Sequence, residues 1–232
     1  MENTLSFLEN RKNGFARFCA RLSQSRTEES AAAIVMNANP FTLGHLALVE
    51  RAAREFPAVH LFVLEEDASL VPFAVRWKLV TEGVARLPHV VCHRSGPYLI
   101  SSATFPSYFL KDEAAVIQGH ARLDLALFGQ IAKSLNITAR YAGEEPSSQV
   151  TGLYNQVMAQ ELPKVGIQFI EVPRASLDGM PISASTVRKL IHDGNLEAIR
   201  PLVPDSTWKF FHTPEAAPAI AAIQAAGDVV HY

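Results

Sequence analysis

The sequence predicts a single doubly wound α/β domain, in which helices cover both faces of a five-stranded parallel sheet. Short apolar runs of strand length alternate along the chain with longer segments whose apolar residues recur at helical spacing. The first run, Ala31–Met36, contains no polar residue, as is typical of a strand buried on both faces of a parallel sheet. With 232 residues, 48% of them hydrophobic, the chain can bury a substantial core.

A polar turn and a helix follow the first strand, and together they open a βαβ unit. Pro40, in the turn 37–40, prevents the strand from continuing, because proline lacks the N–H that a ladder needs. Apolar residues recur at helical spacing from Leu43 to Phe56, which predicts an amphipathic helix. The start of this helix therefore presents free backbone N–H groups to the crevice above the strand ends.

The remaining elements continue this alternation. Further strands are expected at residues 58–64, 90–93, 138–142 and 168–172, and further helices at 72–87, 114–135, 150–160, 182–192, 196–202 and 214–226. We expect an N-terminal helical stub and linker at residues 1–30, the α/β domain at 31–211, and a C-terminal helical tail at 212–232.

Composition and charge exclude several kinds of function. A net charge of −2 with interspersed signs argues against a nucleic-acid or acidic-membrane surface. The two cysteines, Cys19 and Cys92, have no paired or metal-ligand spacing, and the eight histidines form no metal motif, so we expect no metal site. No apolar run approaches the roughly 20 residues of a membrane span, and the polar start is not a signal peptide. We therefore expect a soluble, cytoplasmic protein.

The segment Thr42-Leu43-Gly44-His45 carries groups that suit a polyphosphate. Thr42 and His45 fall on one face of the first helical turn, beside the free amides, and Gly44 lets a ligand approach the backbone. The positive end of the helix opposes a further positive charge, so His45 is expected to be neutral in the empty site. The alternative is a threonine N-cap followed by a helix-entry glycine and a solvated histidine.

A second segment, residues 182–188 with the sequence I-S-A-S-T-V-R, opens a late helix. Together, T-L-G-H after the first strand and I-S-x-S-x-V-R before this helix resemble the signatures of the nucleotidyltransferase superfamily, which close on the phosphates of ATP from opposite sides. The longer runs N-A-N-P-F-T-L-G-H (37–45), I-S-S-A-T-F-P-S-Y-F-L-K (100–111) and Y-A-G-E-E-P (141–146) are similar to citrate lyase ligase. This resemblance covers roughly Ser6 to Phe211.

The resemblance implies an ATP-dependent ligase that forms AMP and pyrophosphate, with Mg²⁺ arriving on the nucleotide. Such an enzyme activates acetate as acetyl-adenylate and acetylates the thiol of the prosthetic group, derived from dephospho-coenzyme A, on the acyl carrier (gamma) subunit of citrate lyase. Longer members of the family carry an acetyltransferase-like domain before the region that residues 31–211 resemble. The sequence has a stub of residues 1–30 at this place, so the chain is expected to be either a naturally short version or a piece of a longer protein.

The resemblance also implies site residues. His45, Thr42 and Arg188 are the expected catalytic residues, with Thr42 where many relatives have a first histidine and Arg188 directed at the leaving pyrophosphate. ATP is expected to contact Asn37, Asn39, Pro40, Phe41, Thr42, Gly44, His45, Arg76, Gly143, Glu144, Ile182, Ser183, Ser185 and Arg188. The acyl or acceptor side is expected at Ser101, Ser102, Thr104, Tyr108, Lys111 and Asp124. Ala184 replaces a serine that is common in the superfamily motif.

Several of these residues have plainer interpretations. Arg76 and Lys78 lie near a helix N-terminus, where cations oppose the dipole, so they suit a ligand or form a solvated pair. Asp124, among apolar residues of its predicted helix, faces either the crevice or the polar edge of the helix. The hydroxyl-rich segment 98–111 is either a surface loop or an acceptor site.

Two other functions remain open at this point. One is an adenylyltransferase that acts on a phosphate ester such as pantetheine phosphate or nicotinamide mononucleotide. The other is a non-catalytic module that binds a nucleotide or a carrier protein. The presence of Thr42, Gly44, His45, Ser183 and Arg188 together disfavours the second.

Overall fold

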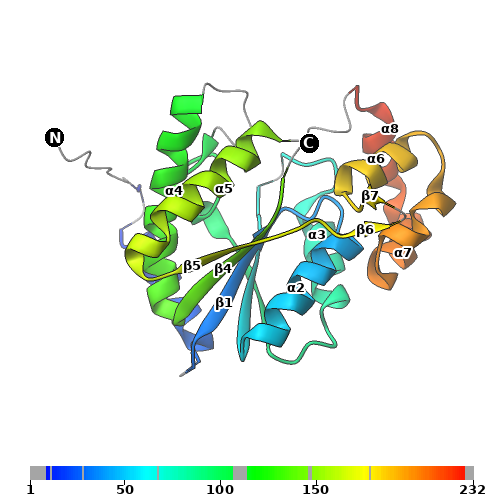
Figure 1. The fold of residues 1–232 in the computed structure, drawn as a ribbon. Helices are drawn as coiled ribbons and strands as arrows, with labels where there is room; N and C mark the ends of the chain where they lie inside the picture. The colour runs from blue at the N-terminus through cyan, green and yellow to red at the C-terminus, as the bar shows by residue number, and fades with distance from the viewer. Residues whose placement is uncertain are drawn as a thin grey trace.

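The computed structural model describes residues 9–10, 12–27, 29–66, 68–106, 114–145, 148–177 and 179–227. Five parallel strands form one sheet in the order β3-β2-β1-β4-β5 (Figure 1). Their bounds are β1 Ala31–Met36, β2 Ala58–Val63, β3 Val90–Arg94, β4 Ile137–Gly143 and β5 Gln168–Val172. The predicted fold class and all five predicted strands are confirmed.

Helices cover both faces of the sheet, with α4 and α5 on one face and α2 and α3 on the other (Figure 1). The α-helices are α1 Gly14–Leu22, α2 Leu43–Glu55, α3 Phe73–Gly83, α4 Ala114–Leu135, α5 Gln149–Glu161, α6 Ala184–His192, α7 Asp205–Phe211 and α8 Ala217–Ala225. Helices α6, α7 and α8 lie beyond α2 and α3, so the C-terminal part of the chain forms a further layer on that side of the molecule (Figure 1).

Strand β1 lies at the centre of the sheet and contributes to both cores. Ala32, Ile34 and Met36 belong to the core beneath α2 and α3, whereas Ala31 and Ala33 belong to the core beneath α4 and α5. Successive side chains of a strand point to opposite faces, so a strand covered on both sides must be apolar throughout. This burial explains the uninterrupted apolar run.

The structure refines the predicted elements of the C-terminal part. The short helix predicted at residues 196–202 is present as a 3-10 helix that contains Pro201. The predicted helix 214–226 is a 3-10 turn, Pro214–Ala216, followed by α8. Helix α7 and the hairpin of β6 (Ser176–Leu177) and β7 (Met180–Pro181) were not predicted, because elements this short hold too few residues to show a period.

The strand order places a candidate crevice between β1 and β4. The chain leaves β1 toward β2 on one side, whereas β4 lies on the other side of β1. In open parallel sheets, ligands bind beyond the carboxyl ends of the strands at such a switch point. Asn37 follows the end of β1, and Gly143 is the last residue of β4.

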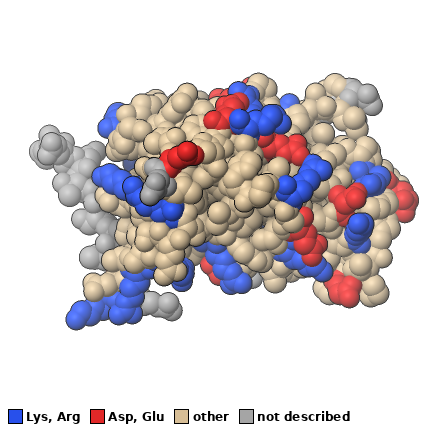
Figure 2. All heavy atoms as spheres, turned by 90° about the horizontal axis from the view of Figure 1, so that it is seen from below, with Lys and Arg blue, Asp and Glu red and all other residues tan. Residues whose placement is uncertain are grey.

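The surface seen from below carries both signs of charge (Figure 2). Lys and Arg side chains are interspersed there with Asp and Glu, without a large area of one sign. Across the described parts of the chain, no helix combines the length and the apolar character needed to span a membrane.

Candidate active site

The turn after β1 is held in place by neighbouring segments. Ala38 adopts a positive φ of 53°, and the Asn39–Pro40 peptide bond is cis. The Asn39 side-chain oxygen accepts from the Val71 amide at 3.0 Å, and the Asn37 side chain bonds the Ser69 hydroxyl at 2.9 Å. Polar groups of the segment after β2 thus fix the shape of this turn.

Helix α2 begins with a reciprocal cap between Thr42 and His45. The Thr42 hydroxyl accepts from the His45 amide at 3.3 Å, and His45 Nδ1 accepts from the Thr42 amide at 3.1 Å. Thr42 is 1% exposed, and its hydroxyl also lies 2.9 Å from His45 Nδ1, so Thr42 positions the imidazole. Because Nδ1 is an acceptor here, the proton of a neutral imidazole lies on Nε2, which leaves Nε2–H as a donor.

The surroundings of His45 favour the neutral imidazole. Burial, followed by the positive charges of Arg174 and Arg188, lowers the pKa of His45 to about 4. The predicted neutral state agrees with this direction, although burial rather than the helix dipole is the main cause. The Phe41 ring stacks on the imidazole at 5.9 Å between centroids and restricts its orientation.

Gly44 brings the two sequence signatures into contact. A Cβ atom on Gly44 would lie 2.9 Å from the carbonyl oxygen of Ile182, which is closer than real Cβ contacts allow. Ile182 directly precedes Ser183, the N-cap of α6, whose hydroxyl accepts from the Thr186 amide at 3.0 Å. The starts of α2 and α6 therefore meet, and both helices present free backbone N–H groups at this place.

Hydroxyl groups and a guanidinium surround the start of α6. The Ser183 hydroxyl lies 2.8 Å from those of Ser185 and Thr186. Arg188 is buried, at 2% exposed, and its Nη1 donates to the carbonyl oxygen of Asn39 at 2.6 Å. Arg188 thus connects α6 to the turn after β1.

Besides the starts of α2 and α6, the ends of β4 and β5 border the site, and residues 143–145 after β4 form what we call its wall. The Glu144 amide donates to the Val172 carbonyl at 2.8 Å, and Asn155 donates to the Gly143 carbonyl at 3.1 Å. A Cβ atom on Gly143 would meet nothing within 4 Å, so a ligand has space there. Arg174 binds this wall through the Glu144 carbonyl at 3.0 Å.

Arg174 was not predicted as a site residue. It belongs to no motif, but it lies two residues beyond the end of β5, where a parallel sheet directs its loops to the crevice. Its position just after a predicted strand is therefore the feature of the sequence that could have identified Arg174 as a site residue.

The structure corrects the expected role of Arg76. The side chain is 0% exposed, so it is neither a solvated residue nor one that faces a ligand. Its guanidinium donates to the carbonyl oxygens of Val71, Asn37, Leu64 and Glu66 at 2.7–2.9 Å. Arg76 fastens the turn after β1 to the segment after β2. Asn39, Pro40 and Phe41 are likewise buried, and they shape the turn from within.

Asp124 is also buried rather than at the crevice or on a polar edge. Its carboxylate accepts from the Ile100 amide at 2.6 Å, the Thr104 hydroxyl at 3.0 Å and the Tyr154 hydroxyl at 2.7 Å. Burial raises the pKa of Asp124 despite these donors. The buried Ser101 hydroxyl bonds the Pro97 carbonyl at 2.8 Å. Asp124, Ser101 and Thr104 therefore fold the turn 100–105 and do not contact a ligand.

Of the expected acceptor residues, Ser102 alone is both described and exposed. Its hydroxyl donates to Glu66 at 2.7 Å. Tyr108 and Lys111 lie outside the described residues.

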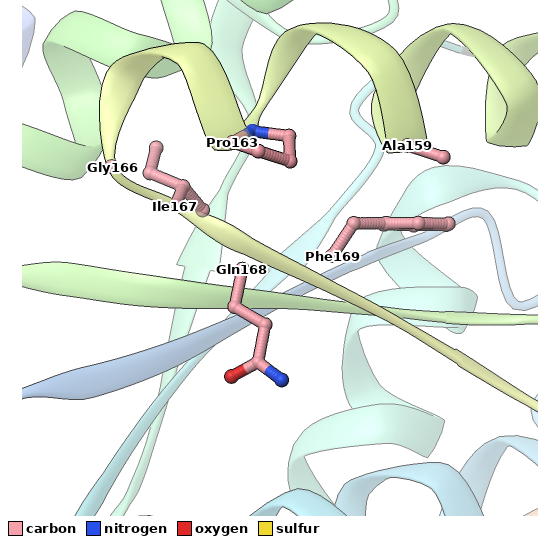
Figure 3. Close-up of a pocket in the computed structure, with 6 residues that line it drawn as sticks. All are labelled: Ala159, Pro163, Gly166, Ile167, Gln168 and Phe169. Atoms are coloured by element: carbon pink, nitrogen blue, oxygen red, sulfur yellow. The ribbon is translucent and has the colours of Figure 1, made fainter.

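The cavity in Figure 3 is not part of this site. It measures about 390 Å³ and lies between the end of α5 and the start of β5, at the opposite end of β5 from Arg174. Its lining contains no ionisable side chain, and Gln168 points away from the other labelled residues. Among the described residues, no three His, Cys, Asp or Glu side chains form a group that could hold a metal ion.

Comparisons with known proteins identify the family of the chain and agree with the fold. Residues 31–211 match the model of the citrate lyase ligase C-terminal domain. The chain is 43% identical to the citrate (pro-3S)-lyase ligase of Klebsiella pneumoniae and 40% identical to that of Escherichia coli, across 88% of its own length. It spans only 61% and 60% of those relatives. A pantoate–β-alanine ligase (pantothenate synthetase) structure from Thermus thermophilus shares the fold, with a TM-score of 0.50 at 20% identity over 90% of this chain and 81% of that one.

Proposed function

The chain belongs to the citrate lyase ligase family, and we propose that it activates acetate with ATP and transfers the acetyl group to a carrier-protein thiol. The contact of Gly44 with Ile182 carries this proposal, because it joins the two phosphate-binding signatures at the carboxyl end of the sheet. The proposed acceptor is the thiol of the dephospho-coenzyme A-derived group on the acyl carrier (gamma) subunit of citrate lyase. We assign the activity to residues 31–211, with residues 1–30 and 212–232 as flanking segments.

In the first step, an acetate oxygen attacks the α-phosphorus of ATP, the bond to the bridging oxygen breaks, and pyrophosphate leaves. Negative charge grows on the α-phosphate and on the leaving group, so fixed donors do most of the catalysis. His45 Nε2–H donates to the α-phosphate, while Thr42 holds the opposite ring nitrogen through its amide. A neutral imidazole with a pKa of about 4 suits hydrogen-bond donation rather than proton transfer.

The leaving group lies at the start of α6 in this mechanism. Ser183, Ser185 and the free amides of α6 bind the β and γ phosphates. Arg188, whose charge lies close enough to lower the pKa of His45, stabilises the departing pyrophosphate. Gly143 and Glu144 line the space for the base and ribose.

In the second step, the carrier thiol attacks the carbonyl carbon of acetyl-adenylate, and AMP leaves with both electrons of the acyl–oxygen bond. The thiol proton passes to solvent. No acyl-enzyme is needed. Mg²⁺ enters on the phosphates of ATP, which fits a donor set of hydroxyls, amides and guanidinium groups rather than a carboxylate cluster.

Mass spectrometry of the products tests the proposal. The protein is incubated with ATP, Mg²⁺ and acetate, with and without the carrier subunit. We expect AMP and pyrophosphate in equal amounts and a carrier heavier by one acetyl group. Adenylate transfer to pantetheine phosphate or nicotinamide mononucleotide, without acetylation, would instead identify an adenylyltransferase. ATP binding without turnover would identify a non-catalytic module.

A further inference from the structure

Arg174 occupies an unusual position among the charged side chains that the structure describes. Its Nη2 forms an ion pair with Glu145, and its Nε donates to the Glu144 carbonyl at 3.0 Å. The Arg174 and Glu145 side chains are 23% and 18% exposed, so this described ion pair is shielded on both sides. Other described pairs leave at least one partner more than a quarter exposed.

The backbone after Arg174 leads directly to the contact between the two signatures. The Ala175 carbonyl accepts from the Ile182 amide at 2.8 Å and closes the β6–β7 hairpin. The Ile182 carbonyl in turn lies against Gly44. Arg174 therefore connects the wall formed by residues 143–145 to the starts of α2 and α6, where the phosphates of ATP are proposed to bind.

The charges around His45 favour the binding of an anion. Arg174 and Arg188, from two different elements, both act on the imidazole and oppose its protonation. Glu145 already bonds Arg174 and also accepts from the Ser148 amide at 3.2 Å. Phosphate oxygens entering this place would meet a guanidinium whose described partners are the Glu145 carboxylate and the Glu144 carbonyl.

We propose that Arg174 is a phosphate-binding residue of the site, and that Glu145 is the counter-ion it exchanges for the phosphate chain of ATP. This inference rests on the proposed function. In the empty site Glu145 holds the guanidinium beside His45. A phosphate group accepts parallel N–H bonds from an arginine and carries more charge than a carboxylate, so the exchange favours the nucleotide.

Two substitutions that break the same ion pair test this exchange. ATP affinity is measured by calorimetry with Arg174→Gln, Glu145→Gln and the wild type, each with Mg²⁺ at two salt concentrations. We expect Arg174→Gln to weaken ATP binding by about tenfold or more and to reduce its salt dependence. Glu145→Gln removes the competing anion, so ATP affinity is expected to stay equal or increase. Arg86→Gln, which breaks the exposed pair with Glu50, serves as the control and is expected to change nothing.

If Arg174 serves only to hold the wall 143–145, both substitutions weaken ATP binding by similar factors, and this overturns the inference while the proposed function stands. Unchanged ATP affinity in a folded Arg174→Gln protein overturns it equally. A wild type that binds no ATP overturns both. A second measurement needs no nucleotide: the pKa of His45, followed by NMR, is expected to rise in Arg174→Gln, and thermal melts confirm that each variant is folded.

Discussion

Replacing Gly44 with alanine would place a methyl group 2.9 Å from the carbonyl oxygen of Ile182. Because this neighbour is backbone, it cannot rotate away, and the starts of α2 and α6 must move apart. Overpacking of this kind costs about 1–3 kcal/mol, and alanine in a helix recovers up to about 1 kcal/mol. The net loss of stability is therefore about 0–3 kcal/mol, which leaves a folded protein.

The effect on turnover is expected to be larger. A displacement of about 1 Å between reacting groups costs about 10²-fold in rate, so Gly44→Ala should lose about that factor in ATP- and acetate-dependent pyrophosphate release. Gly129→Ala is the matched control, because a Cβ atom there, inside α4, would meet nothing within 4 Å. It should keep full turnover and gain a few tenths of a kcal/mol or more in a urea melt. Near-normal turnover and ATP affinity in Gly44→Ala would refute the claim that the two signatures act together.

Other substitutions and pH test further parts of the mechanism. His45→Ala should lower turnover by about 10²–10³-fold with little change in the thermal melt. His45→Asn or His45→Gln should recover part of the lost turnover. Normal pyrophosphate release in His45→Ala would remove His45 from the mechanism. Arg188→Ala should lower turnover more than ATP affinity in parallel kinetic and calorimetric measurements, and equal losses would contradict its role with the leaving group. Asp124→Ala should destabilise the protein by about 3 kcal/mol in urea, since the buried Ile100 amide and the Thr104 and Tyr154 hydroxyls lose their acceptor; a loss within measurement error would contradict this. Burial lowers the pKa values of His60 and His93 to about 4, so the stability that they contribute is complete above pH 6.5 and should fall as the unfolded chain takes up protons, by on the order of 2 kcal/mol for each histidine at pH 5. Melts that are flat between pH 7 and 5 would contradict that last expectation.

The parts of the fold that follow from periodicity were predictable from the sequence. The first strand and α4 begin and end at the predicted residues, because a run such as Ala31–Met36 or a 22-residue amphipathic pattern contains its own signal. The meeting of T-L-G-H with residues 182–188 depends on strand order. It was expected from a resemblance to a family and not from the spacing of the residues.

Roles that depend on burial were not predictable. Arg76 and Asp124 look like surface or site residues in the sequence. Tertiary packing instead buries Arg76 among backbone carbonyls, and it buries Asp124 beside one backbone amide and two hydroxyls. Arg174 lies in a loop without a motif, and only the arrangement of β4, β5 and the hairpin brings its charge to His45.

The most direct test of the central claim is a crystal structure of the protein with a non-hydrolysable ATP analogue and Mg²⁺. We predict that the α-phosphate lies within hydrogen-bonding distance of His45 Nε2. The β and γ phosphates are predicted to contact the Ser183 and Ser185 hydroxyls and the free amides of α6. A nucleotide bound beyond side-chain reach of both residues 42–45 and residues 183–188 would contradict the claim.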